Sequence, residues 1–129
     1  MSWKSQQDYT LGFQISRPTT AVAVGIVSGV DTLIFTSPSI PKGTFLVIVN
    51  EVNIPTGTLT QGSLRIETTT DGVVAVQTID ADITSFPSLA YCVKSDGTNV
   101  VTVHCDCTTG AGTWTIGAGV VQITQLTNN

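Results

Sequence analysis

The stretch HCDCTTG, residues 104–110, concentrates the side chains of this sequence that could do chemistry. It holds the only histidine, two of the three cysteines and an aspartate. Thiolates, imidazoles and carboxylates are the ligands that zinc takes in proteins. A thiol with a lowered pKa can be redox-active, and an imidazole can act as a general base. Each of these chemistries requires the side chains to converge on one point, so their directions decide which is possible.

The directions follow from the strand that carries this stretch. Asp-Gly at 96–97, placed between two apolar runs, is a strong signal for a two-residue hairpin turn. With this turn, Lys94 pairs with Asn99, and Cys92 pairs with Val101 on the returning strand. The sequence therefore predicts a hairpin whose second strand contains HCDC.

Side chains alternate between the two faces of a strand, so Cys105 and Cys107 share one face with Cys92, whereas His104 and Asp106 share the other. The cysteines and the histidine cannot converge on one ion within one chain. Cys92 and Cys105 would be about 13 Å apart along the strands, whereas a disulfide needs Cα atoms within about 7 Å. We expect three reduced thiols packed on the inner face of a sheet, with a metal or redox role as the alternative.

Catalysis by His104 would need a nucleophile and an orienting acid. Asp106 lies about 6.6 Å away along the same strand, which favours a polar pair on a surface or interface. Asp80 and Asp82 also share a face and could hold calcium, but a solvated strand end is the simpler interpretation. We predict no catalytic, cofactor-binding or metal-binding residue, no cofactor, and a protein that is not an enzyme.

The elements that position these residues are strands. The chain contains 22 threonines and 12 glycines, a composition that disfavours helices. Apolar residues alternate with a period of two, as in SLRIE at 63–67, where Leu64 and Ile66 face inward and Arg65 lies on a solvated face. Turn signals recur about every ten residues, which is typical of an antiparallel β-sandwich or barrel. The expected strands are 9–15, 21–27, 30–36, 44–54, 59–68, 73–80, 83–93, 98–107 and 113–126.

The length of 129 residues suits one domain. Residues 1–8 are polar apart from Trp3 and are predicted to form a mobile arm, with Trp3 as a candidate anchor to a larger assembly. Residues 9–129 are predicted to form the single domain.

Charge is scarce, since only 11% of the residues are charged against about 25% in ordinary domains. The five basic residues are scattered, so we expect no nucleic-acid partner. No apolar run approaches 18 residues and the N-terminal residues lack a secretory signal, so we expect no membrane span and folding in the cytosol of the cell that makes the protein. The apolar stretch AVAVGIV at 21–27 makes Val24 and Ile26 candidates for an interface between copies.

Two stretches carry a resemblance to a known family. IPKGTFLVIVNEVNI at 40–54 resembles the turn and central strand of tumour-necrosis-factor-like and complement-like jelly rolls. GTWTIGAGVVQITQL at 112–126 is similar to the last strand of such domains in bacteriophage virion proteins. Together the two stretches cover about 30 residues. The resemblance implies an antiparallel two-sheet jelly-roll sandwich, a homotrimer and a place in a virus particle.

These observations lead to one hypothesis and one alternative. The first is a non-enzymatic structural virion protein, made in the host cytoplasm. It would decorate or cement a capsid or form a head or tail fibre knob, with the major capsid protein or another virion protein as its partner. The alternative is a module on the same fold that binds a host-surface glycan or receptor. Sugar sites normally use an exposed aromatic platform, and only 6% of the residues are aromatic.

Overall fold

The computed structural model describes residues 14–17, 20–50, 52–53, 56–83, 85–86 and 88–127. Within these ranges it does not describe the side chains at 52–60, 79–86, 109, 114 and 115. These residues form strands and turns, and none of them forms a helix. No described helix could therefore cross a membrane. The strands are β1 (Gln14–Arg17), β2 (Val22–Val27), β3 (Thr32–Thr36), β4 (Lys42–Val49), β5 (Val52–Asn53), β6 (Thr56–Thr68), β7 (Gly72–Ile83), β8 (Ser85–Phe86), β9 (Leu89–Asp96), β10 (Val101–Ile116) and β11 (Val121–Thr127).

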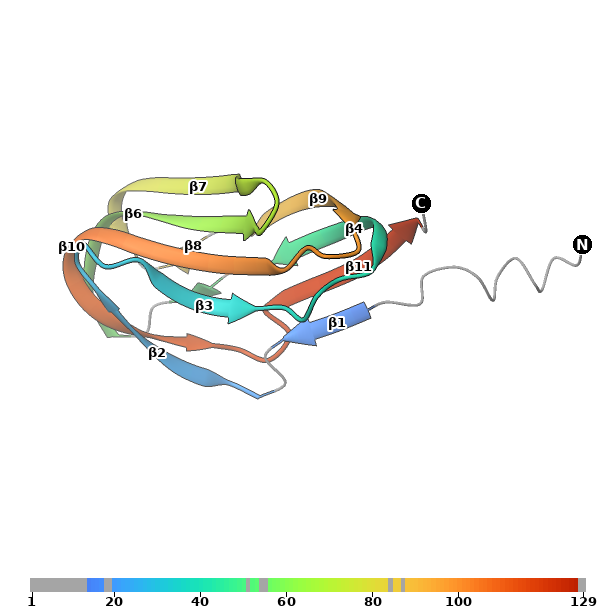
Figure 1. The fold of residues 1–129 in the computed structure, drawn as a ribbon. Helices are drawn as coiled ribbons and strands as arrows, with labels where there is room; N and C mark the ends of the chain where they lie inside the picture. Colours follow the sequence, from blue (N-terminus) through green and yellow to red (C-terminus); the bar gives the residue numbers. More distant parts are fainter. Residues whose placement is uncertain are drawn as a thin grey trace, which may run out of the picture.

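Two antiparallel sheets form the body of the molecule (Figure 1). Sheet A has the strand order β1-β11-β4-β9. Sheet B has the order β2-β10-β6-β7, with β3 also paired to β10, and β5 and β8 form a small separate pair. The prediction of an all-β, antiparallel chain is confirmed.

The strand pairs are nested one inside the next. Pairs at successive levels are Gln14–Thr124, Val22–Ile116, Lys42–Asp96, Val52–Phe86 and Leu64–Gln77. In every one of these pairs the two residue numbers add up to between 138 and 141. The chain is therefore one long hairpin with its tip at residues 69–71. It is rolled up so that β10 lies beside β6 and β11 beside β4.

The strands β2 and β3 lie end to end along β10 rather than side by side. Both run antiparallel to β10, β2 along residues 111–116 and β3 along residues 102–105. Between them, Ser28 N donates to Gly110 O and Gly29 N to Cys107 O. Ser28 and Gly29 thus form a turn that interrupts a strand without reversing it.

The predicted hairpin at 96–97 is wrong. Strand β9 pairs with β4 in sheet A, whereas β10 pairs with β6 in sheet B, so the chain crosses between the sheets at this point. The Asp96 carboxylate accepts hydrogen bonds from the backbone N and the hydroxyl of Thr98, at 2.9 and 2.7 Å. Asn99 is buried, and its carbonyl accepts a bond from Ile40 N. These contacts turn the chain towards the other sheet instead of back along β9.

A second boundary also differs from the prediction. The strand expected at 98–107 was predicted to end at residue 107, but β10 continues from Val101 to Ile116 because β6 pairs with it along nearly all of that length. The chain reverses later, at 117–120, where Val120 N donates to Gly117 O and Gly119 has a φ of 73°. The segment 113–126, which was expected to be one strand, is therefore divided by a turn at 117–120.

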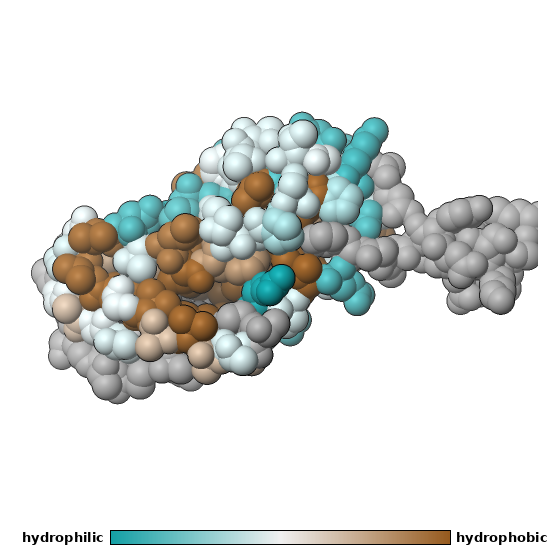
Figure 2. All heavy atoms as spheres, turned by 60° about the horizontal axis from the view of Figure 1, so that its bottom comes forward, coloured by the Kyte–Doolittle hydropathy of each residue, from teal (hydrophilic) through white to brown (hydrophobic). Residues whose placement is uncertain are grey.

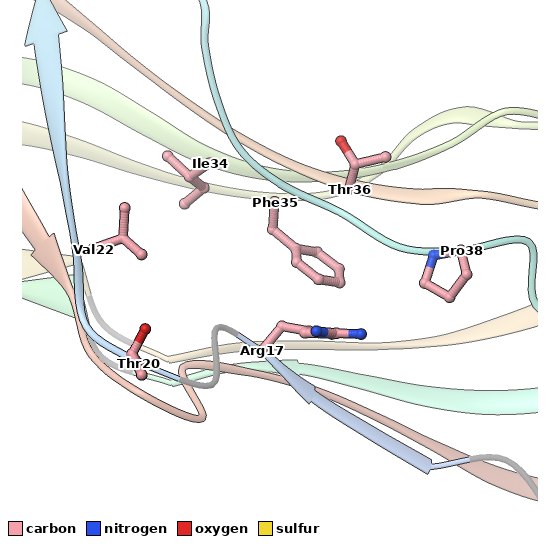
Figure 3. Close-up of a pocket in the computed structure, with 7 residues that line it drawn as sticks. All are labelled: Arg17, Thr20, Val22, Ile34, Phe35, Thr36 and Pro38. Carbon is pink, nitrogen blue, oxygen red and sulfur yellow. The ribbon is translucent and has the colours of Figure 1, made fainter.

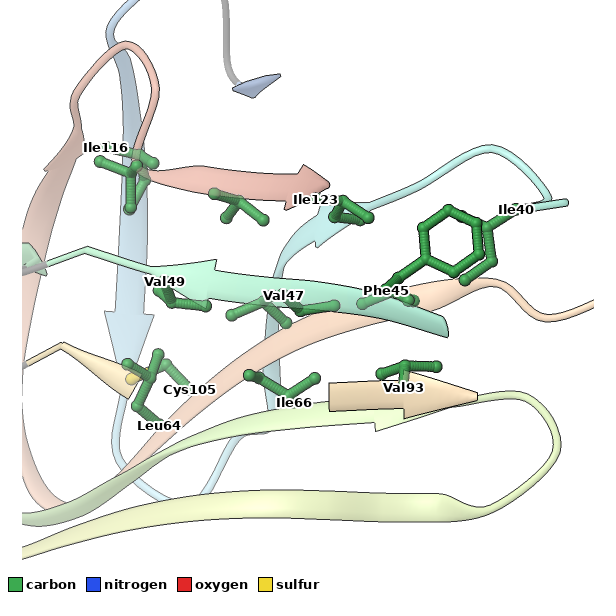
Figure 4. Packing of buried hydrophobic residues seen from close by; sticks show 14 of the residues in the cluster. Ile40, Phe45, Val47, Val49, Leu64, Ile66, Val93, Cys105, Ile116 and Ile123 are labelled. Atoms are coloured by element: carbon green, nitrogen blue, oxygen red, sulfur yellow. The ribbon is translucent and has the colours of Figure 1, made fainter. Parts of the chain in front are cut away.

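The core lies between the two sheets (Figure 4). Phe45, Val47 and Val49 of β4 point inward from sheet A, and Leu64 and Ile66 of β6 point inward from sheet B. The alternation predicted for residues 63–67 is therefore confirmed. The side chains between these positions point away from the core, so they can contribute to a functional site on the surface.

Candidate functional site

The outward residues of β10 and β6 form a polar network on the outer face of sheet B. In β10, Val103 and Cys105 point into the core, so His104 and Asp106 point away from it. Pairing with β6 places Arg65 directly beside His104. The prediction that His104 and Asp106 share a face opposite Cys105 is confirmed.

Arg65 is the centre of this network. Its Nη1 donates to Asp106 Oδ2 at 2.9 Å, its Nη2 donates to Asp31 Oδ1, and its Nε lies 3.4 Å from Glu67 Oε2. Only 15% of the Arg65 side chain is exposed. Burial lowers the pKa of Arg65, but the hydrogen bond and charge of Asp31, together with Asp106 and Glu67, outweigh it, so the pKa is raised. Arg65 lies on the outer face, as the alternation predicts, but its side chain is largely covered because three carboxylates surround its guanidinium.

His104 lies between two of the same carboxylates. Its Nδ1 is 3.1 Å from Asp31 Oδ2 and its Nε2 is 3.4 Å from Glu67 Oε2. Its Nε2 is also 2.9 Å from the hydroxyl of Thr102. The side chain is 17% exposed, and its Nδ1 lacks hydrogen-bond geometry to any described partner.

This cluster offers three atoms of the kind that bind metals. Ligand atoms of Asp31, Glu67 and His104 all lie within 4.8 Å of one another. However, Arg65 already contacts both carboxylates, so a divalent cation would be placed beside a guanidinium. The arrangement is that of an ion-pair network rather than a metal centre.

Thr102, His104 and Asp31 also stand in the order of nucleophile, base and acid. The geometry departs from a working triad in two ways. The contact between His104 Nδ1 and Asp31 is not a hydrogen bond, and Glu67 competes with Thr102 at Nε2. A triad also needs a recess for substrate, and neither Thr102 nor His104 lines the apolar hollow beside β1, β2 and β3 or the polar hollow at Asp106.

An apolar hollow opens on the side of the molecule where β1, β2 and β3 lie. Figure 2 shows apolar side chains gathered around it. The hollow has a volume of about 330 Å³, and Val22, Ile34, Phe35 and Pro38 line it with Arg17 at its margin (Figure 3). Ile34 and Phe35 pack against the core but remain partly exposed here. The reason is that no described strand lies between β1 and β3 to cover them.

A polar hollow of about 370 Å³ lies beside the network on the outer face of sheet B. Gln61, Ser63, Thr78 and Asp106 contribute to its walls. Ser63 donates to Asp106 Oδ1 through both its backbone N and its hydroxyl, at 3.1 and 2.8 Å. Gln61 has a φ of 45°, a left-handed conformation, where the pairing of β6 with β7 is irregular.

The cysteines are divided between two environments. All three are free thiols; Cys105 and Cys107 are buried, but Cys92 is exposed. Burial is the main cause that raises the pKa values of Cys105 and Cys107, and the charge of Asp106 adds to it. The expectation that Cys92 is buried is wrong, because it followed from the hairpin at 96–97. In the observed pairing, Val93 and Ser95 of β9 point inward instead.

The other predicted residues are placed as follows. Ile26 is fully buried in the core of a single chain, so it leaves no surface for a neighbouring copy, whereas Val24 is half-buried against that core. The contact role of Val24 remains a prediction. Trp3 lies outside the described residues, as does the arm 1–8, and the side chains of Asp80 and Asp82 are not described.

Sequence reasoning missed Asp31, Glu67 and Arg65 as members of the network that contains His104. A signal for two of them existed, since the alternation in 63–67 places Arg65 and Glu67 outward. Nothing local connects Asp31, which belongs to the interruption between β2 and β3. The chain matches no protein-family model, and no curated protein is significantly similar to it.

Proposed function

We propose that the two sheets form a jelly roll. A jelly roll contains eight strands in two sheets. If β2 and β3 count as one interrupted strand and the short β5–β8 pair is set aside, eight strands remain. The nested pairing supports this topology, because the first strand lies beside the last, the second beside the seventh, and so on to the hairpin of β6 and β7.

The function we propose is that of a non-enzymatic structural protein of a virus particle that assembles from copies of itself. One observation carries the assembly. Eight large apolar side chains of the described chain are each between 41% and 55% exposed, while charged residues are only 11% of the sequence. Permanent protein–protein interfaces are rich in apolar side chains and poor in charged ones. The resemblance to phage jelly rolls supports a homotrimer that decorates or cements a capsid or forms a fibre knob.

The test has two parts. Mass spectrometry of particles purified from the source of the sequence should find this protein in many copies per particle. Removal of residues 1–8, with Trp3, should then weaken its attachment to stripped particles without changing its circular dichroism spectrum. Absence of the protein from the particles would refute the virion role. Unchanged attachment of the truncated chain would refute only the anchor.

A second candidate function rests on the polar hollow beside the network. Amide, hydroxyl and carboxylate groups such as those of Gln61, Ser63 and Asp106 can hydrogen-bond the hydroxyls of a sugar. This favours recognition of a host-surface glycan on the same fold. Binding to a glycan array that is lost in Asp106→Ala but kept in Lys94→Ala would favour this candidate, and no binding at millimolar glycan would exclude it.

A further inference from the structure

The two edges of sheet B carry most of the exposed apolar side chains. Within the described part of the chain, six of the eight large apolar residues that are more than 40% exposed belong to these edges. They are Val22, Val27, Val30 and Leu33 on or between β2 and β3, and Val73 and Val76 on β7. The two edges lie at opposite ends of the strand order, so one copy presents two separate apolar strips.

These edges lack the charged residues and prolines that protect many edge strands, although β3 is short, with five residues, and its pairing with β10 is irregular between Val103 and His104. Natural edge strands are short, or carry charges or proline, which prevents pairing with another chain. In sheet A, β1 has only four residues and ends at Arg17, and β9 carries Lys94 and Asp96. By contrast, neither β3 nor the first half of β7, residues 72–78, contains a charged residue or proline.

The two strips match each other in position. Leu33 pairs with His104, His104 with Arg65, and Arg65 with Val76. One row across the outer face of sheet B therefore begins with Leu33 on one edge and ends with Val76 on the other. Their side chains are 52% and 53% exposed.

We propose that copies of this chain associate head to tail, with β3 of one copy beside the first half of β7 of the next. This deepens the proposed function, on whose self-assembly it rests. Because the two strips differ, the contact is heterologous and closes into a ring when the rotation between copies permits it. Successive strands of sheet B alternate in direction, so β7 and the neighbouring copy's β3 run antiparallel and Val76 of one copy packs against Leu33 of the next.

A ring doubles the area that this contact covers on each copy. β3 has five residues, which extend about 17 Å, and two sheets about 10 Å apart with their outward side chains give a depth of about 20 Å. One contact then covers about 340 Å² on each copy, or about 700 Å² in total. In a ring every copy uses both strips, so about 700 Å² of each copy is covered, close to the value of about 800 Å² per partner in a standard interface.

Two single substitutions and their mixture test the proposal. Leu33→Lys and Val76→Lys each place a charge in one strip, on a side chain that is already half exposed, and sedimentation velocity at about 10 µM gives the mass. Each variant alone should become a monomer. An equimolar mixture should form dimers and no larger species. The intact β7 strip of Leu33→Lys can bind the intact β3 strip of Val76→Lys, and the two altered strips of such a dimer cannot bind a further copy. Gln122→Lys on the outer face of sheet A is the matched control and should keep the wild-type mass.

The outcomes separate this inference from the proposed function. A monomeric wild-type chain would overturn both. A wild-type oligomer that survives both lysine substitutions would overturn the edge contact alone, and so would a mixture that forms no dimer. Circular dichroism establishes that each variant is folded. If either is not, Leu33→Thr and Val76→Thr replace them, with at least a tenfold weaker association expected of each.

Discussion

Replacement of Arg65 by alanine tests the network on sheet B. The substitution removes the guanidinium that contacts Asp31, Glu67 and Asp106 and leaves three carboxylates near one another. Because Arg65 is only 15% exposed, water replaces these contacts incompletely. Like charges that were compensated then repel, so the folded state should lose stability.

The expected magnitude follows from the exposure of the partners. Asp31 and Asp106 are 52% and 40% exposed, so each pair should contribute about 1 kcal/mol, the upper end for exposed ion pairs. The contact with Glu67 is longer, at 3.4 Å, and should add about 0.5 kcal/mol. The free energy of unfolding should fall by about 2–3 kcal/mol, which lowers the Tm by roughly 6–12 °C for a chain of this size.

Urea denaturation at one fixed protein concentration measures this loss. Arg65→Lys should lie between wild type and alanine, because an ammonium keeps the charge but cannot reach three partners at once. Lys94→Ala, an exposed lysine on the edge of sheet A, should change stability by less than about 0.5 kcal/mol. The Arg65→Ala loss should shrink in 1 M salt. If Arg65→Ala stays within about 0.5 kcal/mol of wild type at low salt, the network does not stabilise the fold.

Three further predictions concern the thiols and a glycine. Under native conditions an aromatic disulfide reagent should label Cys92 quickly and Cys105 and Cys107 only after unfolding; rapid labelling of all three would contradict their burial. Because the pKa of Cys105 is raised on folding from its ordinary value near 9, the folded state keeps a proton that the unfolded chain loses as the pH rises. Stability should therefore be fully present below about pH 9 and fall by about 1.4 kcal/mol per pH unit above it; Cys105→Ala should remove that part of the slope, and an unchanged slope would count against the assignment. Gly43 has a φ of 145°, and a Cβ there would lie 2.3 Å from Thr127 O. Gly43→Ala should cost about 2–4 kcal/mol in thermal or urea unfolding, whereas Gly25→Ala, with open space around it, should cost less than about 1 kcal/mol; equal losses would contradict the close approach.

The strands of this fold were predictable where one face is buried and the other is not. Leu64 and Ile66 alternate with Ser63, Arg65 and Glu67, and that alternation sets both the strand and the direction of each side chain. Likewise, the opposition of His104 to Cys105 follows from the two-residue period alone. Such statements depend only on neighbours in sequence, which is why they hold.

Strand partners were harder to predict. Asp96-Gly97 has the composition of a tight hairpin, yet β9 and β10 belong to different sheets. The decisive contacts there include Ile40 N to Asn99 O, between residues far apart in sequence. The burial of Cys92 was wrong for the same reason. Asp31 could not be placed beside His104 because their contact depends on how β2 and β3 share β10.

The mass of the full chain in solution tests the central claim, self-assembly, most directly. Sedimentation equilibrium between about 1 and 100 µM should give three times the chain mass of 13.5 kDa. The assembled mass should dominate at the highest concentration and decrease towards the lowest, as expected of contacts of about 700 Å² in total. A single species of 13.5 kDa across that range, folded and soluble, would contradict it.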